Sequence, residues 1–355
     1  MSDKKRVAVV GYGGMGSWHT RHLLESDVCE LAGIWDIAEA RRTVAAEKGI
    51  HVYGSLEDLL SDGSVDIVTI AVPNDSHLPI AVQSMEAGKN VISEKPVAMD
   101  HTELQKMIDT SNSTGKLFTV HQNRRWDCDF LVMKDIYASG KLGDVFGIES
   151  RYHGSRGIPG DWRGEAKHGG GMMLDWGVHL IDQIFGIVYD RKLESVYCRC
   201  DHITNDEVDD GFKLDLYFEG GLTAHVEVGT SHFISMPRFF MTGTNGAAMV
   251  NGWKTDCRVV SCDKWEEKDV KPVVTAAGLT KTMAPRDEKT TTETVIPLPV
   301  SDVHDFYRNV CRAIDGKEEQ IVKHDEVMRV MLVMEAAFES DRLGVPVKFD
   351  DTLKK

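Results

Sequence analysis

Hydrophobic and polar positions follow one rhythm up to about residue 122 and another beyond it. In the first part, short runs dominated by Val, Ile and Ala, such as Arg6–Val10 and Asp66–Val72, alternate with stretches of helical spacing. Such runs are typical of strands buried on both faces, and strands that alternate with helices form parallel sheets. Residues 4–122 are therefore predicted to form a doubly wound α/β domain. Its other strands are expected at Glu30–Trp35, His51–Tyr53, Asn90–Ser93 and Leu117–Val120, and its helices at Trp18–Ser26, Ala38–Lys48, Leu56–Leu60, His77–Ala87 and Thr102–Thr114.

In the second part, residues 123–355, apolar and polar residues alternate with period two over longer runs. This pattern predicts a mostly antiparallel sheet, with Gly220-Gly221 as a hairpin turn and one inserted helix at Met172–Phe185. Lys268–Thr294 lacks periodicity and is expected to be a surface excursion. Two apolar stripes, within 303–314 and 327–338, predict packing helices that close the chain. The strands are expected at Val145–Tyr152, Leu193–Cys200, Gly211–Glu219, Leu222–Gly229, Phe239–Thr242, Ala247–Asn251 and Arg258–Cys262, and a further helix at Phe130–Ser139.

Composition and charge narrow the class of protein. The 355 residues carry 41 Lys and Arg against 56 Asp and Glu, a formal charge of −15, which argues against a binder of nucleic-acid phosphates. No apolar run approaches the ~20 residues of a membrane span, so a cytoplasmic protein is expected. The seven cysteines are irregularly spaced and predict no disulfide framework. Cys198 and Cys200 lack a second Cys/His pair, so no metal site is expected.

The segment Gly11–Gly16 fits the pattern G-x-G-x-x-G and lies between the first strand and the first helix. In that context Gly11 permits a tight turn, Gly13 lets the backbone approach a pyrophosphate, and Gly16 lets helix and strand pack closely. The amides at the helix N-terminus then face the pyrophosphate. Asp36 follows 20 residues after Gly16, where a carboxylate bonds the adenosine ribose and repels a 2′-phosphate. The sequence therefore predicts a Rossmann domain that binds NAD in preference to NADP.

Three further polar stretches lie where such a fold places its chemistry, at the carboxyl ends of strands: Val72–His77, Ser93–Pro96 and His121–Arg125. A fourth, Gly169–Asp182, is rich in glycine and contains the spacing Asp-x-x-x-His. The Glu-Lys-Pro motif together with this segment resembles the glucose–fructose oxidoreductase, inositol dehydrogenase and rhizopine-catabolism family (Gfo/Idh/MocA). The resemblance extends over roughly residues 5–250.

The resemblance implies an N-terminal Rossmann domain and a C-terminal α/β domain with a large, open, mostly antiparallel sheet. It also implies hydride transfer between a nicotinamide cofactor and a secondary hydroxyl or ketone of a sugar, glycoside or cyclitol. Family members assemble as dimers or tetramers through the open sheet. We expect the same of this chain, because a bare sheet face of this size would expose a large apolar patch. No nucleic-acid or membrane partner is expected.

The residue patterns and the resemblance together give three sets of site residues. The catalytic set is Lys95, Asp175 and His179; the cofactor-binding set is Gly11, Gly13, Gly14, Met15, Gly16, Asp36, Pro73, Asn74, His77, Glu94, Lys95, Asn123, Trp162 and Arg163; and the substrate-binding set is Lys95, Arg124, His153, Asp175 and His179.

Oxidation of an alcohol removes a hydride and a proton, so the protein must supply a base beside the hydroxyl. Asp175 and His179 are four residues apart and share one face if the segment is helical. His titrates near neutral pH, which favours His179 as the proton acceptor, with Lys95 polarising the oxygen; the opposite assignment stays open. Glu94 would position Lys95 or bond the cofactor ribose.

Two other functions use the same residues. In a redox-assisted glycosidase, tightly held NAD oxidises the sugar, an aglycone is eliminated and the ring is reduced again. A non-catalytic regulator would sense NAD without turnover, and the presence of Lys95, Asp175 and His179 speaks against it.

Overall fold

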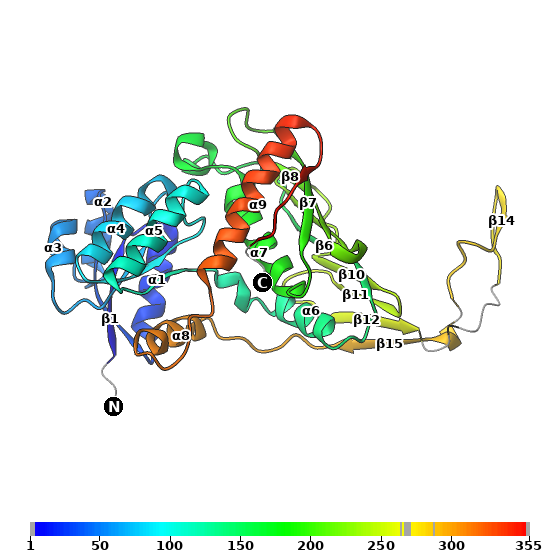
Figure 1. The fold of residues 1–355 in the computed structure, drawn as a ribbon, viewed down its shortest axis with the longest axis horizontal. Helices are drawn as coiled ribbons and strands as arrows, with labels where there is room; N and C mark the ends of the chain where they lie inside the picture. Colours follow the sequence, from blue (N-terminus) through cyan, green and yellow to red (C-terminus); the bar gives the residue numbers. More distant parts are fainter. Residues whose placement is uncertain (1–3, 263–264, 266–270, 287, 353–355) are drawn as a thin grey trace.

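The computed structural model describes residues 4–262, 265, 271–286 and 288–352 and contains two large β-sheets (Figure 1). The first sheet has the strand order β2-β1-β3-β4-β5, and every pair in it is parallel. Residues 7–10 of β1 are fully buried, as expected for a strand covered on both faces. The predicted doubly wound sheet is confirmed. Its elements are β1 Lys5–Val10, α1 Gly14–Glu25, β2 Cys29–Trp35, α2 Glu39–Glu47, α3 Leu56–Ser61, β3 Ile67–Ile70, η1 Asn74–Ser76, α4 His77–Glu86, β4 Asn90–Ser93, α5 His101–Thr114 and β5 Phe118–Val120.

The second sheet has nine strands in the order β15-β12-β11-β10-β6-β9-β8-β7-β16. All its pairs are antiparallel except β6 with β9, which confirms the mostly antiparallel prediction. The predicted turn at Gly220-Gly221 joins β8 to β9, and both glycines have φ near +80°. The strands are β6 Val145–His153, β7 Leu193–Asp201, β8 Gly211–Phe218, β9 Thr223–Gly229, β10 Phe239–Gly243, β11 Gly246–Val250, β12 Cys257–Cys262, β15 Thr291–Ile296 and β16 Val347–Lys348.

Helices cover one face of this sheet. They are η2 Asn123–Trp126, α6 Cys128–Ala138, α7 Val178–Ile187 and α9 His324–Leu343. The predicted helix over 172–185 begins instead as a π-helical segment, η5 Met173–Gly177, and continues as α7. The predicted division of the chain at residue 122 falls in the turn between β5 and η2 and stays a prediction.

Along β8 and β9 the other face of the sheet is polar. On β8 and β9 the inward positions, such as Leu214 and Val226, are fully buried, while the alternate positions carry charged and polar groups. The outward side chains there are Lys213, Asp215, Tyr217, His225 and Glu227. The expectation of an apolar patch is therefore wrong for these two strands, because every second residue is polar.

The last part of the chain returns to the first domain. Helix α8, His304–Ile314, lies beside β1 and α1 at the foot of the first sheet (Figure 1). Lys5 forms an ion pair with Asp315 at 2.8 Å, and the Sγ atoms of Cys29 and Cys311 are 3.5 Å apart. The imidazole of His324, at the start of α9, contacts the carbonyl oxygen of Phe118 at 2.8 Å. The first and last quarters of the chain thus pack as one body.

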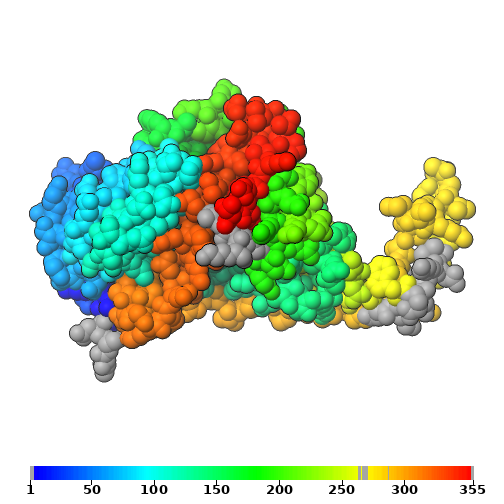
Figure 2. Space-filling view, viewed as in Figure 1, coloured from blue at the N-terminus to red at the C-terminus, as the bar shows by residue number. Residues whose placement is uncertain are grey.

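The region after β12 leaves the body of the molecule. The hairpin of β13 Val273–Thr275 and β14 Gly278–Thr280 projects away from the nine-stranded sheet (Figure 1), and Figure 2 shows it as a separate arm. The predicted surface excursion is wrong at its end, because β15 pairs with β12 as an edge strand. Residues 268–270 and 287 of that prediction lie outside the described residues. Within the described part of the chain, no helix is long and apolar enough to span a membrane.

Candidate active site

The glycine loop between β1 and α1 is shaped by close backbone contacts. Gly11 has φ +91°, and a Cβ there would overlap the carbonyl oxygen of Ala71. A Cβ on Gly16 would overlap the carbonyl oxygen of Gly11, so this glycine lets α1 pack on the loop. Around Gly13 a Cβ would meet nothing within 4 Å, and no side chain caps the first turn of α1. The loop therefore presents open backbone and helix-terminal amides, which suits a pyrophosphate.

A cavity of about 590 Å³ opens in front of this loop. Its wall consists of the glycine loop, the carboxyl ends of the parallel strands and a loop that follows β6. A site at the carboxyl ends of the strands is the expected ligand position in a doubly wound sheet. Predicted site residues that line it are Gly11, Gly13, Gly14, Met15, Asp36, Pro73, Asn74, Glu94, Lys95, Trp162, Arg163 and Asp175.

Asp36 is fixed at the end of β2 by two backbone amides. The amide of Tyr12 donates to Oδ2 at 2.7 Å and that of Ala38 to Oδ1 at 2.8 Å. Arg42 Nη1 donates to the carbonyl oxygen of Asp36 at 2.6 Å, whereas Arg41 lines the cavity. The carboxylate is thus held in one orientation at the adenosine end, with lone pairs left for hydroxyl donors.

Lys95 and Asp175 form the charged centre of the cavity. Lys95 Nζ lies 3.0 Å from Asp175 Oδ1 and donates at 2.9 Å to the Asp175 carbonyl oxygen. Arg163 Nε donates to Oδ2 of the same carboxylate at 3.1 Å, and Arg163 also pairs with Asp161. Although burial alone would raise the pKa of Asp175, the charges of Lys95 and Arg163 hold that pKa below its ordinary value. Residues from both domains therefore meet here as ions.

His179 lies one turn beyond Asp175, in α7, and is 3% exposed. Its Nδ1 is buried without a hydrogen-bond partner among the described residues. Burial, together with the charges of Lys95 and Arg124, holds its pKa well below the ordinary value. The ring is accordingly neutral at neutral pH and can accept a proton. It does not line the cofactor cavity but lies behind Asp175, on the side of Arg124.

Glu94 anchors the strand end that carries Lys95. His19 Nε2 and His121 Nδ1 both contact Glu94 Oε1, at 2.7 and 2.8 Å, and the amide of Lys95 donates to Oε2 at 3.2 Å. Burial would raise the pKa of this carboxyl, but the two imidazoles hold it well below the ordinary value. Since His19 Nε2 donates to Glu94, its Nδ1 accepts from the Tyr307 hydroxyl. Glu94 therefore links Lys95 to α8 through His19.

An aromatic wall lies on the His179 side of the charged centre. The guanidinium of Arg124 packs over the rings of Tyr152, Trp176 and Trp253, with 5.6, 4.4 and 4.8 Å to the ring centroids. The hydroxyl of Tyr152 and Nε of Arg124 are buried without hydrogen-bond partners in the described part of the molecule. Three flat rings thus surround the Arg124 guanidinium beside buried polar atoms without partners among the described residues, outside the lining of the cofactor cavity.

His179 does not line the cavity, and neither do five other predicted residues. Gly16 acts beneath the loop, as described above. His77 is fully buried, and its ring contacts the carbonyl oxygens of Val72 at 2.9 Å and Val97 at 3.2 Å. The five are Gly16, His77, Asn123, Arg124 and His153.

His153 lies apart from the cluster because neighbouring residues of a strand point to opposite faces. Tyr152 faces Trp176 and Arg124, whereas His153 stacks on His232 and lies 3.5 Å from Glu227. We therefore omit His153 from the substrate site proposed below.

Two residues of the site carried no signal in the sequence. Trp253 comes from a loop without a motif. Asp209, in the loop before β8, accepts from the amide of Met173 at 2.7 Å and so fixes the segment that carries Asp175. Only its position beside Gly171 in the fold reveals this role.

Within the described residues, His19, Glu94 and His121 form one of three groups that could hold a metal ion. Hydrogen bonds already account for Glu94 Oε1 and for both nitrogens of His19. The expectation of no metal stays an expectation.

Comparisons with known proteins cover both domains. Residues 5–122 match the model of an oxidoreductase family with an NAD-binding Rossmann fold, and residues 130–249 match the GFO/IDH/MocA C-terminal domain. An uncharacterized oxidoreductase of Schizosaccharomyces pombe is 32% identical, covering 86% of this chain and 89% of its own. The scyllo-inositol 2-dehydrogenase (NADP(+)) of Bacillus subtilis is 26% identical, covering 96% and 94%. An NAD-binding protein from Listeria innocua has a solved structure that is 42% identical, with a TM-score of 0.94, covering 98% and 100%.

The glycine cradle fits a dinucleotide, and both parts of the chain match models of one family. The chain therefore belongs to the Gfo/Idh/MocA family of oxidoreductases and carries its NAD-binding Rossmann domain.

Proposed function

We propose that the protein is a dehydrogenase that uses NAD to oxidise a secondary hydroxyl of a sugar, glycoside or cyclitol, or to reduce the corresponding ketone. The observation that carries this proposal is the ion pair of Lys95 and Asp175 at the wall of the cofactor cavity, with neutral His179 one turn away. An alcohol oxidation needs a base and a positive group at the same oxygen, and these residues provide both.

The glycine loop would hold the pyrophosphate and Asp36 the adenosine ribose. Bound nicotinamide supplies the acceptor or donor of the hydride. Lys95 Nζ would donate a hydrogen bond to the substrate oxygen and stabilise its developing negative charge. His179 would take the hydroxyl proton at Nδ1, which has no hydrogen-bond partner among the described residues. Burial and neighbouring cations hold the pKa of its ring low, which keeps the ring neutral but makes it a weaker base than a free imidazole. Asp175 and Arg163 would keep Lys95 in place.

A carbohydrate-like substrate is favoured by the aromatic wall. Sugars and cyclitols present apolar faces that pack on flat rings and hydroxyls that need hydrogen-bond partners. The three rings around Arg124, with the unpaired Tyr152 hydroxyl and Arg124 Nε, meet both needs.

The deciding experiment is a screen of inositols, sugars and glycosides with NAD, followed by NADH absorbance, on the unmodified protein and on Lys95→Ala. We expect NADH formation with at least one polyol and its loss in the variant. Equal activity of the variant would contradict the assigned chemistry. Cleavage of a glycoside without net NADH would instead identify the redox-assisted glycosidase, which uses the same ion pair.

We further propose that the protein is a homo-oligomer that assembles through the outer face of the nine-stranded sheet. The support is that, in the part of the chain that the structure describes, the helices pack on the opposite face. The polar side chains of β8 and β9 would then form hydrogen bonds and ion pairs across the interface rather than an apolar core.

A further inference from the structure

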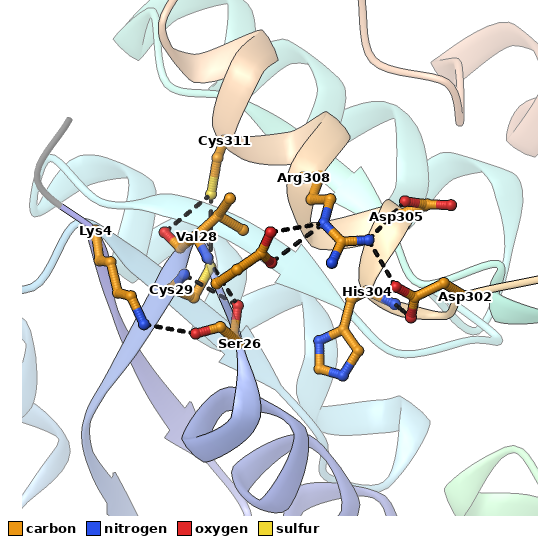
Figure 3. A network of polar contacts seen from close by, with 10 residues as sticks. Lys4, Ser26, Val28, Cys29, Asp302, His304, Asp305, Arg308 and Cys311 are labelled. Carbon is orange, nitrogen blue, oxygen red and sulfur yellow. Dashed lines mark hydrogen bonds and ion pairs between the residues drawn. The ribbon is translucent and has the colours of Figure 1, made fainter. Parts of the chain in front are cut away.

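Two cysteines far apart in the sequence meet where α8 packs on the first domain. Cys29, the first residue of β2, and Cys311, in α8, have their Sγ atoms 3.5 Å apart. Cys29 is 1% exposed and Cys311 is 7% exposed. Figure 3 shows the Cys311 side chain pointing from α8 toward the chain at Ser26–Cys29. The sulfurs therefore need to approach by only about 1.5 Å to reach a disulfide bond length of roughly 2.0 Å.

The surroundings hold both cysteines in this orientation. Ser26 Oγ accepts from the amide of Cys29 at 3.0 Å, which fixes the start of β2. On the helix side, Arg308 binds Asp27 at 3.0 Å, which holds α8 to the same turn. Arg308 also binds Asp302, just before α8, at 2.6 Å (Figure 3). The contact is thus built from both sides and does not depend on a mobile side chain.

The two thiols differ in acidity. The hydrogen bond between the two sulfurs, with the charge of Lys5, lowers the pKa of the Cys311 thiol. The same bond and burial raise the pKa of Cys29. Cys311 is also the more exposed of the two. It is therefore the group that meets an oxidant first, and Cys29 is the resolving thiol.

We propose that Cys29 and Cys311 form a reversible disulfide that locks α8 onto the Rossmann sheet, with a peroxide as the oxidant. Cys311 attacks one peroxide oxygen and becomes a sulfenic acid, and the first water leaves. The sulfur of Cys29 then attacks Cys311 Sγ, and the hydroxyl leaves with the Cys29 proton as a second water. Two thiols lose two electrons and two protons, and hydrogen peroxide is reduced to two waters. A dithiol reductant reverses the reaction.

The position of the pair gives the bond a consequence for the site. Tyr307 lies four residues before Cys311 on the same face of α8, and its hydroxyl bonds His19 in the network under Lys95. The disulfide would close a loop over residues 29–311, about four fifths of the chain, which stabilises the folded protein by restricting the unfolded one. It would hold Tyr307 in place when the protein is heated.

The experiment uses the reduced full-length protein with a small excess of hydrogen peroxide. Remaining thiols are alkylated in denaturant, and unreduced peptides are mapped by mass spectrometry. We expect one cross-linked peptide pair, containing Cys29 and Cys311, and a thiol count that falls from seven to five (7 − 2). The melting temperature should rise by about 5 °C or more, and dithiothreitol should restore the original value.

Matched variants distinguish the Cys29–Cys311 disulfide from oxidation of other cysteines. Cys29→Ser and Cys311→Ser should each abolish the cross-link and the rise in melting temperature, whereas Cys262→Ser, a partly exposed cysteine elsewhere, should retain both. Cys198 and Cys200, two apart on one strand, should stay reduced. The proposal is overturned if peroxide leaves Cys29 and Cys311 open to alkylation, drives Cys311 to sulfinic acid without a cross-link, or joins either to another cysteine. Because the cross-linked peptides are mapped in the unmodified protein, this test does not depend on whether the variants fold.

Discussion

At the scale of single residues, the site depends on how buried charges compensate each other. Asp175 is stable as a carboxylate in a largely buried position because Lys95 and Arg163 each contact one of its oxygens. Burial, together with the charges of Lys95 and Arg124, keeps a proton off His179. One arrangement therefore prepares a positive group and a neutral base side by side, which neither residue would provide alone in water.

We predict that Lys95→Ala and His179→Ala each lower turnover by roughly 10²–10⁴-fold, the scale of a positioned acid or base. NAD affinity should change little. The losses should be far from additive in the double variant, because both groups serve one proton transfer. Steady-state kinetics and fluorescence titration of NAD measure the two effects, with the exposed Lys106→Ala as the control. A defect explained by lost NAD affinity would contradict the assigned roles.

A second prediction concerns cofactor choice. Asp36→Ala should narrow the preference for NAD over NADP by about tenfold, corresponding to about 1.4 kcal/mol, because the carboxylate no longer repels the 2′-phosphate. Binding of both nucleotides is measured by titration. Glu39→Ala, which removes an exposed carboxylate just beyond the cavity, should leave the ratio unchanged. Tighter binding of NADP than of NAD by the unmodified protein would refute the argument.

At the scale of elements, the segment that carries Asp175 is held from outside. Gly169 and Gly171 have φ +71° and +102°, and Asn74 Nδ2 donates to the carbonyl oxygen of Gly169 at 2.7 Å. Asp209 then accepts from the amide of Met173 where the π-helical segment begins. A π-helical turn is uncommon and frequent at functional sites, and here it sets Asp175 toward Lys95.

This anchor predicts a pH dependence. Burial raises the pKa of Asp209 from 3.8 to about 7, so the folded protein holds this proton more tightly than the unfolded chain. The contribution of protonated Asp209 to the free energy of unfolding is fully present below about pH 4. It is lost as the pH rises through about 7. The variant Asp209→Asn keeps a side-chain oxygen that can accept from the amide of Met173, but it carries no charge. The free energy of unfolding of this variant, relative to that of the unmodified protein, should therefore increase between pH 5 and pH 8.

Urea unfolding at both pH values measures the difference, with Asp206→Asn, exposed in the same loop, as the control. A constant difference between the unmodified protein and Asp209→Asn across this range would contradict the raised pKa of Asp209.

At the scale of the whole molecule, the parts of the site come from distant segments. Lys95 belongs to the first sheet, Asp175 and His179 to a helix on the second, and Tyr307 to α8, which returns from the far end of the chain. Each domain thus depends on the other for a complete site. The helices leave the outer face of the nine-stranded sheet uncovered, and this face is where we place contacts between copies.

Light scattering should accordingly give a mass of two or more times 39.5 kDa at micromolar protein. Tyr217→Lys, at an outward position of β8, should lower that mass because it places a charge in the proposed interface. Tyr189→Lys, exposed beyond the end of α7, should not. A monomeric mass for the unmodified protein would refute the assembly.

The sequence alone determined the order of elements and the cofactor cradle, because these depend on local rules: buried runs for strands, helical spacing for helices, and glycines where Gly11 and Gly16 must approach other backbone. It missed β15, whose Thr-rich edge position needs no apolar face, and β16, which has only two residues. Contacts between distant segments were decided by the tertiary structure alone. The return of α8 brought Tyr307 and Cys311 to the first domain, whereas the opposite orientations of Tyr152 and His153 follow from strand alternation alone. No local pattern records such contacts, because residues hundreds of positions apart meet only when both domains are packed.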